Sequence, residues 1–190
     1  MQAVFSGLFY FAPIALFQGF ILVGYTTIYT MAPVFSLVYD QDITEDTAMV
    51  FPELYKELTK GRSLSYKTFF IWLLISVYQG GVIMILAIYL FENEFVRIVS
   101  ISFTALIFNE LLMVCMEIST WHYLMVIAQL GTGIVYLFSM RMLPHYFDLA
   151  FIGTFSFVWK VTLIVSASSL PIILSVLVKN LYAPPSYTKL

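Results

Sequence analysis

The first 39 residues contain no Asp, Glu, Lys or Arg, and this feature constrains the fold more than any other. A helix that crosses a bilayer needs about 20 mainly apolar residues, because the hydrocarbon core is about 30 Å thick. Further apolar runs lie between residues 68 and 178. Only 11% of the 190 residues are charged and 61% are hydrophobic, whereas an ordinary soluble domain has about 25% charged residues. The sequence therefore predicts an all-α, polytopic transmembrane helical bundle.

The apolar runs predict five full membrane-spanning helices and a truncated first helix. Residues 1–39 are too long for one crossing and too short for two full ones, and proline, glutamine and glycine cluster at 13–19. We therefore expect a short helix over 1–13 and a full helix over 19–38. The other spans are expected over 68–91, 96–117, 121–140 and some part of 150–178.

Charge near the helix ends predicts the orientation of the bundle. The long polar stretch 40–67 is separated from the polar tail by four spans, so both lie on the same side of the membrane. Together they carry six Lys and Arg residues, whereas the opposite connections carry two and Lys160 is ambiguous. This excess predicts that stretch and tail face the cytosol, with a short amphipathic helix at 52–60 lying at the interface. The chain then divides into a helix pair (1–39), a cytosolic loop (40–67), a four-helix region (68–178) and a cytosolic tail (179–190).

Several functions are not supported by the sequence. The net charge of −2 gives no general attraction to nucleic acid. Cys115 is the single cysteine and is expected to be a small buried hydrophobe. His122 and His145 are predicted at opposite membrane faces, so they cannot share a metal ion. No spacing indicates a catalytic triad, a phosphate-binding glycine loop or a cleavable signal peptide. We expect no catalytic residue, cofactor or metal in this chain.

Polar residues inside a span are costly unless they pair or line a wet path, and the second helix holds several. Thr26 and Thr30 are four residues apart and share a face, with Thr27 beside them. Pro33 lacks an N–H and therefore leaves the carbonyl of Tyr29 without its usual donor. Two interpretations are open at this point. The segment either lines a polar path, or it is an ordinary kink with threonines bonded to their own backbone.

Two other spans carry polar residues at informative positions. Gln79 precedes Gly80 and Gly81, and a glycine pair with an amide is typical of close helix packing. Asn109 and Glu110 lie beyond the expected midplane of their span, where a carboxylate should face the interior of the bundle. An independent ion or solute channel is an alternative function that depends on these last two residues alone.

A set of motifs extends along the chain. A helix with an internal proline, Pro33, runs into the sequence Asp-Gln-Asp at 40–42. It is followed by a Pro-x-Leu-Tyr element at 52–55, a basic patch at 60–62, a Phe-x-x-Trp helix at 69–72 and Gln79. The set resembles the C-terminal membrane region of the type IV P-type ATPases, the phospholipid flippases. "GRSLSYKTFFIW", "NELLMV" and "PPSYTKL" are similar to the subgroup that works without the usual accessory subunit in trans-Golgi and endosomal membranes.

The resemblance implies a fragment of a larger machine. The chain would run from the end of the fifth to the tenth helix of a ten-helix parent that uses ATP and Mg²⁺. Its partners would be phospholipid, the membrane and the remaining ATPase domains, because the "DKTGT" motif and the nucleotide-binding domain are missing here. The alternative is a standalone, non-enzymatic multi-pass membrane scaffold or regulator derived from a flippase.

The resemblance also implies roles for particular residues. Those expected along the lipid path are Thr26, Thr27, Thr30, Pro33, Asn109 and Glu110. Asp40 and Asp42 would couple the membrane helices to the cytosolic domains. In one respect the sequence departs from the family, since Thr26 stands where many members have asparagine. A hydroxyl is smaller and cannot make the two-sided contacts of an amide, so the choice of headgroup is expected to differ.

Overall fold

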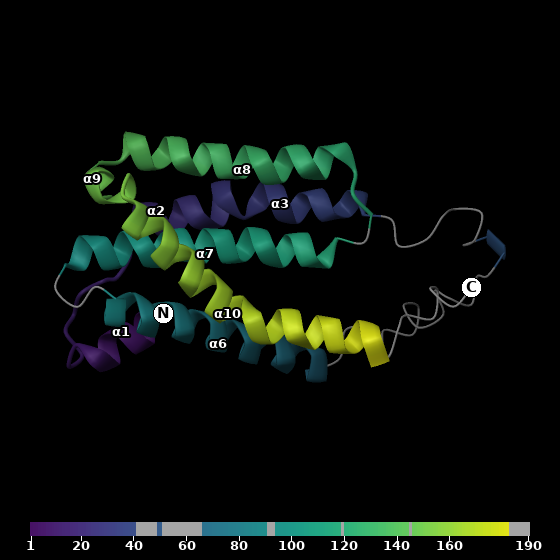
Figure 1. Ribbon diagram of the computed structural model, residues 1–190, viewed down its shortest axis with the longest axis horizontal. Helices are drawn as coiled ribbons and strands as arrows, with labels where there is room; N and C mark the ends of the chain where they lie inside the picture. The colour runs from purple at the N-terminus through teal and green to yellow at the C-terminus, as the bar shows by residue number, and fades with distance from the viewer. Residues whose placement is uncertain (41–48, 51–65, 91–93, 119, 145, 183–190) are drawn as a thin grey trace.

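A computed structural model describes residues 1–40, 49–50, 66–90, 94–118, 120–144 and 146–182 (Figure 1). Within this part of the chain, five helical segments are long and apolar enough to cross a membrane: Gly19–Tyr39, Tyr66–Leu90, Phe95–Glu117, Tyr123–Met142 and Phe155–Leu174. The prediction of an all-α bundle with five full helices and a truncated first helix is therefore confirmed. The amphipathic helix expected at 52–60 lies outside the described residues.

The first helix, α1 (Gln2–Leu8), is shorter than the predicted range 1–13. Tyr10 and Phe11 follow it with φ values of 52° and 56°, a left-handed conformation that bulky residues rarely adopt and that a right-handed helix cannot contain. The returning chain is fixed by the side chain of Gln2, whose Oε1 accepts a hydrogen bond of 2.8 Å from the N–H of Leu16.

The second helix, predicted over 19–38, is continuous in space but changes its winding. Its four parts are α2 (Gly19–Gly24), the π-helical turn η1 (Tyr25–Tyr29), α3 (Met31–Ser36) and the short 3₁₀ turn η2 (Leu37–Tyr39). A π turn inside an α-helix is rare and is frequently found at functional sites.

The remaining helices surround one central helix. They are α6 (Tyr66–Leu90), α7 (Phe95–Glu117), α8 (Tyr123–Met142), the single turn α9 (Leu149–Ile152) and α10 (Phe155–Tyr182). In Figure 1, α7 lies between the layer formed by α8, α2 and α3 and the layer formed by α6 and α10. Accordingly 61% of the α7 span is buried, against 17–33% in the other four. The other helices therefore direct most of their surface away from the bundle.

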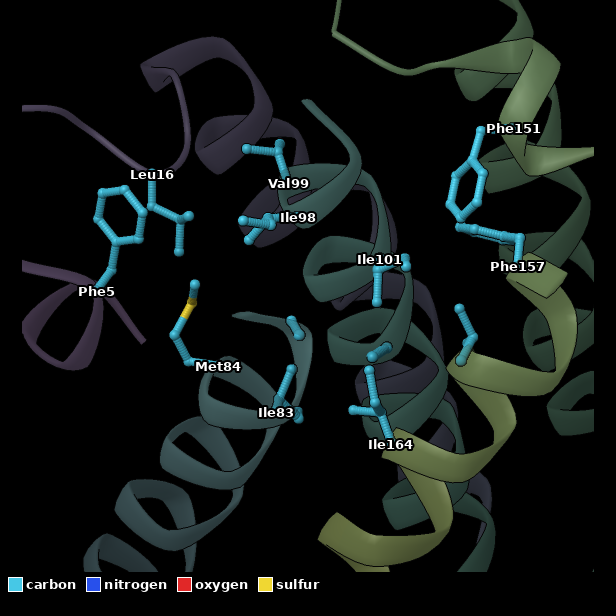
Figure 2. Packing of buried hydrophobic residues seen from close by; sticks show 13 residues of the cluster. Phe5, Leu16, Ile83, Met84, Ile98, Val99, Ile101, Phe151, Phe157 and Ile164 are labelled. Carbon is cyan, nitrogen blue, oxygen red and sulfur yellow. The ribbon is translucent and has the colours of Figure 1, made fainter. Parts of the chain in front are cut away.

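The largest apolar cluster joins α1, α6, α7, α9 and α10. Phe5, Met84, Ile98 and Ile164 are each no more than 2% exposed, and Figure 2 shows them converging from four helices. A second cluster, around Phe103, joins α2, η1, α7 and α8. Because Phe103 and Ile98 lie on different sides of α7, this helix connects the two halves of the bundle.

The chain connections gather at two ends of the bundle. The end of η2, the start of α8 and the end of α10 lie at one end (Figure 1), which is the end predicted to face the cytosol. At the opposite end Arg97 holds two connections together, since its Nε lies 2.6 Å from Glu94 and 3.3 Å from Asp148. Asp148 also caps α9 by accepting a hydrogen bond from the N–H of Phe151.

Candidate functional site

The three threonines of the second helix bond to their own backbone. The Thr26 hydroxyl donates to the carbonyls of Val23 (3.0 Å) and Leu22 (3.3 Å). The Thr27 hydroxyl donates to Val23 at 2.7 Å, and the Thr30 hydroxyl donates to Thr26 at 3.1 Å. The donors are therefore used locally, as in the second of the two interpretations. Each hydroxyl oxygen nevertheless retains acceptor capacity, so this face offers hydrogen-bond acceptors without a charge.

The irregularity in this helix begins before the position that Pro33 alone predicts. The N–H of Thr30 donates to the carbonyl of Tyr25 at 3.2 Å, which is a bond over five residues and defines the π turn. Pro33 is the third residue of α3. The first four N–H groups of a helix have no acceptor within it, so a proline is accommodated there. Proline still gives the Tyr29 carbonyl no donor four residues further on.

The second helix has two unlike faces. Tyr29, Pro33 and Ser36 are buried, and α3 packs mainly against α8. Thr26 and Thr27 are exposed, and Thr30 is half-buried. Thr26 and Thr27 therefore lie outside the buried seam with α8.

A groove of about 360 Å³ runs between α2, η1 and α8, and we call it the α2–α8 groove. Thr27, Tyr29, Phe103 and Ser139 are among its lining residues. The Tyr29 hydroxyl donates to Ser139 Oγ at 2.5 Å, which ties the π turn to α8. Thr27 is the one threonine of the predicted path that lines this groove; Thr26 and Thr30 do not.

Asn109 and Glu110, which are neighbours in sequence, point in different directions. Asn109 is 4% exposed, and its Oδ1 accepts a hydrogen bond of 3.2 Å from Ser168 of α10. Glu110 is half-buried and lies close enough to Tyr25 to interact with it electrostatically. The structure therefore brings Glu110 towards the π turn and directs Asn109 towards α10, where it acts as a link between helices.

Of the two glycines predicted to allow close helix packing on α6, only Gly80 lies close to another described segment. A methyl group added at Gly80 would lie 3.4 Å from Met1, whereas one added at Gly81 would meet no described atom within 4 Å. The close approach expected at Gly81 is therefore not found in this part of the chain. The Nε2 atom of Gln79 is buried and has no hydrogen-bond partner among the described residues.

Asp40 contacts a segment that is distant in sequence. Its Oδ1 accepts hydrogen bonds from the N–H of Thr120 (2.9 Å) and from the Thr120 hydroxyl (3.2 Å). Tyr39 stacks on His122 with 5.9 Å between the ring centres. These contacts fasten the end of the second helix to the connection between α7 and α8. Asp42 and His145 lie outside the described residues.

The sequence reasoning missed several polar residues of α8 and α7. Gln129 is 8% exposed, and neither atom of its amide has a hydrogen-bond partner in the described structure. Tyr136 is 1% exposed, and its hydroxyl lies 2.7 Å from that of Thr104. A signal existed, because Gln129 and Thr132 share a helical stripe with the buried residues Met125 and Tyr136.

Known proteins resemble this chain closely over its whole length. The model of the family described as "Phospholipid-translocating P-type ATPase C-terminal" matches residues 1–185. "Probable phospholipid-transporting ATPase IIB" from Danio rerio is 60% identical over 190 residues, which is 100% of this chain and 17% of that protein. "Probable phospholipid-transporting ATPase tat-5" from Caenorhabditis elegans is 51% identical over 100% of this chain and 18% of its own length.

The similarity extends to yeast. "Phospholipid-transporting ATPase NEO1" from Saccharomyces cerevisiae is 46% identical over 99% of this chain and 17% of its own length. The chain thus spans less than a fifth of the length of these curated relatives. The family model covers all of the described helices, from α1 to the end of α10. The chain belongs to the family of C-terminal regions of phospholipid-translocating P-type ATPases.

Proposed function

We propose that this chain is the C-terminal membrane part of an ATP-driven translocase that moves phospholipid toward the cytosolic leaflet. The names of the relatives and the five membrane-length helices support this proposal. In the parent protein, ATP and Mg²⁺ would supply the phosphoryl-transfer chemistry outside this chain. Within the described residues no three His, Cys, Asp or Glu side chains are placed to hold a metal ion. We infer from the relatives' names that the part played by this chain is to bind and guide lipid.

The single observation that carries the proposal is the exposure of the hydroxyl face of the second helix. Thr26 and Thr27 are exposed, while Tyr29 and Pro33 of the same helix are buried. An exposed row of uncharged oxygen atoms in a span can receive the polar end of a lipid while its tails remain in hydrocarbon.

The chemistry of this face limits what it can recognise. Its hydroxyl donors already bond to backbone carbonyls, so its free capacity is that of an acceptor. A headgroup that carries N–H or O–H donors can bind there, and the half-buried Glu110 of α7 would add a further acceptor. The absence of a permanent positive charge on this face avoids a tight phosphate contact that would slow release.

Asp40 would couple this helix to the rest of the parent. Its carboxylate holds Thr120 at the predicted cytosolic end, next to the loop 40–67 that would meet the cytosolic domains. A movement of those domains would thereby reach the π turn through α3. Asp42 is proposed for the same role from the sequence.

We further propose that the parent acts without an accessory subunit in trans-Golgi or endosomal membranes. The three short segments that resemble this subgroup are the support. Purification of the tagged full-length protein tests the absence of an accessory subunit. A stoichiometric membrane subunit that is required for transport would contradict this part of the proposal.

The path is tested by lipid uptake in the full-length protein that contains this chain. Thr26→Val, Thr27→Val and Thr30→Val each remove a hydroxyl and keep the shape of the side chain. We expect the triple variant to lose transport several-fold and to change its headgroup preference. Ser76→Ala is the matched control, because this exposed hydroxyl on α6 also bonds to its own helix, at 3.0 Å from the Trp72 carbonyl.

The outcomes separate the parts of the proposal. Normal ATP hydrolysis with slow uptake in the threonine variants supports a role in the path. If rate and preference are unchanged in the triple variant, these hydroxyls do not line the path. If the full-length wild type moves no phospholipid under any condition, the function itself is contradicted.

A further inference from the structure

The π turn η1 aligns two buried parts of the second helix. Ile21 of α2 is 4% exposed and belongs to the cluster around Phe103, and Pro33 of α3 is also buried. Ile21 and Pro33 are twelve positions apart, which would place them about 120° apart around the axis of a uniform α-helix with about 3.6 residues per turn. The π turn holds one residue more than an α turn and turns the helix back by about 100°. Both side chains therefore return to nearly the same face.

The winding of η1 also sets the direction of the hydroxyl face. Thr26 and Thr27 lie within η1, and Thr30 follows it as the cap. If η1 rewound as an α-helix, α2 would rotate relative to α3 by about 100°. Because α3 packs against α8 and the contact between Asp40 and Thr120 fixes the end of the helix beyond η2, α2 and the threonines of η1 are the part that would turn. The winding therefore decides which way Thr26 and Thr27 point.

Tyr29 fixes η1 to α8. It is the one buried residue of the turn and is 7% exposed. Among the hydrogen bonds of the described residues, its bond to Ser139 is the only one that joins η1 to another helix. The Ser139 hydroxyl in turn donates to the carbonyl of Tyr136 at 2.8 Å, and the rings of Tyr29 and Tyr136 meet edge to face with 5.5 Å between their centres. The hydroxyl of Tyr29 therefore connects the last residue of the turn to the backbone of α8.

The π winding needs support from outside the turn. It is a rare conformation, and its own hydrogen bond, from the N–H of Thr30 to the carbonyl of Tyr25, is 3.2 Å long, against about 2.9–3.0 Å for a typical N–H···O bond. We propose that Tyr29 is a positioning residue, whose hydrogen bond to Ser139 holds η1 in the π winding that orients the hydroxyl face. Loss of this bond lets the segment rewind and turns the threonines away. The consequence for transport rests on the function proposed above.

Crosslinking in the full-length protein tests the winding without any measurement of transport. Val23 of α2 and Met142 of α8 both line the α2–α8 groove. Cysteines at these two positions, in a background without other reactive cysteines, form a pair for a short bis-maleimide. Tyr29→Phe removes the hydroxyl and keeps the ring. Tyr136→Phe is the matched control, because it removes a buried tyrosine hydroxyl of the same cluster that contacts Thr104 rather than η1.

The yield of the crosslink should fall several-fold in Tyr29→Phe and persist in Tyr136→Phe, with the thermal unfolding midpoints of both variants recorded to verify folding. Ser139→Ala should lower the yield as Tyr29→Phe does, and the double variant should lower it no further, because both changes remove the same bond. An unchanged yield in Tyr29→Phe, or an equal loss in Tyr136→Phe, would overturn the proposal.

Lipid uptake by the same substitutions tests the consequence for transport. Tyr29→Phe should move several-fold less lipid for each ATP and change the headgroup preference, whereas a bond that only stabilised the bundle would lower the unfolding midpoint alone. A reduced crosslink with unchanged transport and preference would therefore overturn the positioning role. If the wild type moves no phospholipid, the proposed function fails, and the crosslink still decides whether Tyr29 holds the π turn.

Discussion

Hydroxyl groups in this bundle act in two different ways at the scale of single residues. Thr26 and Thr27 bond to their own helix and are exposed, so their removal should leave the stability of the bundle nearly unchanged. Thr104 bonds across helices, to Tyr136 at 2.7 Å. A hydroxyl of this second kind is buried, and its partner loses a hydrogen bond when it is removed. We therefore expect removal of an exposed hydroxyl to affect transport but not stability, and removal of a buried hydroxyl that bonds across helices to lower stability.

We expect Thr104→Val to destabilise the protein more than Tyr136→Phe. The Thr104 hydroxyl also donates to the Ser100 carbonyl, so the Tyr136 hydroxyl is the donor in the contact between the two side chains. Thr104→Val leaves that buried donor without an acceptor, which costs about 1–3 kcal/mol. Tyr136→Phe removes the donor itself and should cost about 1 kcal/mol or less. Denaturation midpoints in detergent measure both.

The double variant decides whether an unpaired donor is the cause. Thr104→Val combined with Tyr136→Phe should be no less stable than Tyr136→Phe alone, because no buried polar group remains unpaired. Additive losses would mean that Thr104 stabilises the bundle by packing rather than through this hydrogen bond.

At the scale of helices, the bounds were predictable because the bilayer fixes them. A span must be about 20 apolar residues long, so the charges that flank 68–91 and 96–117 placed α6 and α7 within about two residues. The first helix was predicted too long, since its end depends on the left-handed conformation of Tyr10 and Phe11, which apolar length does not reveal. The π turn was missed for a similar reason, because the proline rule places the break at Tyr29 and the winding changes from Tyr25.

The packing of these helices was much less predictable than their bounds. A helix in lipid is apolar on all sides, so no amphipathic stripe tells which face meets protein. The pairs Tyr29–Ser139 and Asp40–Thr120 join residues 110 and 80 positions apart, and nothing local in the sequence connects them. Asn109 and Glu110 illustrate the difficulty, since both were expected to line one path and they point to different helices.

The π turn and α3 give a prediction at this scale. Pro33→Ala supplies an N–H for the Tyr29 carbonyl, so the segment from Tyr25 can become a regular α-helix. We expect lipid transport by the full-length protein to fall several-fold without a decrease in its thermal unfolding midpoint. Pro171→Ala is the matched control, because Pro171 lies inside α10 and away from the threonine face. Equal loss of transport in both variants would contradict a specific role for the break.

The single turn α9 gives a second prediction about an element. Asp148 caps it through Oδ1 and binds Arg97 through Oδ2. Asp148→Asn retains an oxygen for the cap and loses the charge, whereas Asp148→Ala loses both. We expect Asp148→Ala to cost about 1 kcal/mol more than Asp148→Asn. The difference between wild type and Asp148→Asn should shrink at high salt, as measured by thermal unfolding at two ionic strengths.

At the scale of the whole molecule, α7 lies between two halves of the bundle. The second helix and α8 form one half, and α6 and α10 form the other (Figure 1). The second helix reaches the predicted cytosolic end only through η2 and Asp40. A signal from cytosolic domains that enters the second helix directly from the stretch 40–67 would pass this point before it reaches the π turn.

Asp40 can be tested for this role with two substitutions of different chemistry. Asp40→Asn keeps an oxygen that accepts both hydrogen bonds of Thr120, while Asp40→Ala removes the acceptor and frees the end of the second helix. If the contact transmits movement, Asp40→Ala should hydrolyse ATP in the full-length protein but transport several-fold less lipid for each ATP, and Asp40→Asn should remain close to wild type. If Asp40→Asn is as defective as Asp40→Ala, the charge matters more than the contact with Thr120. If both retain the wild-type ratio of lipid moved to ATP hydrolysed, Asp40 only anchors the helix end and the coupling runs elsewhere.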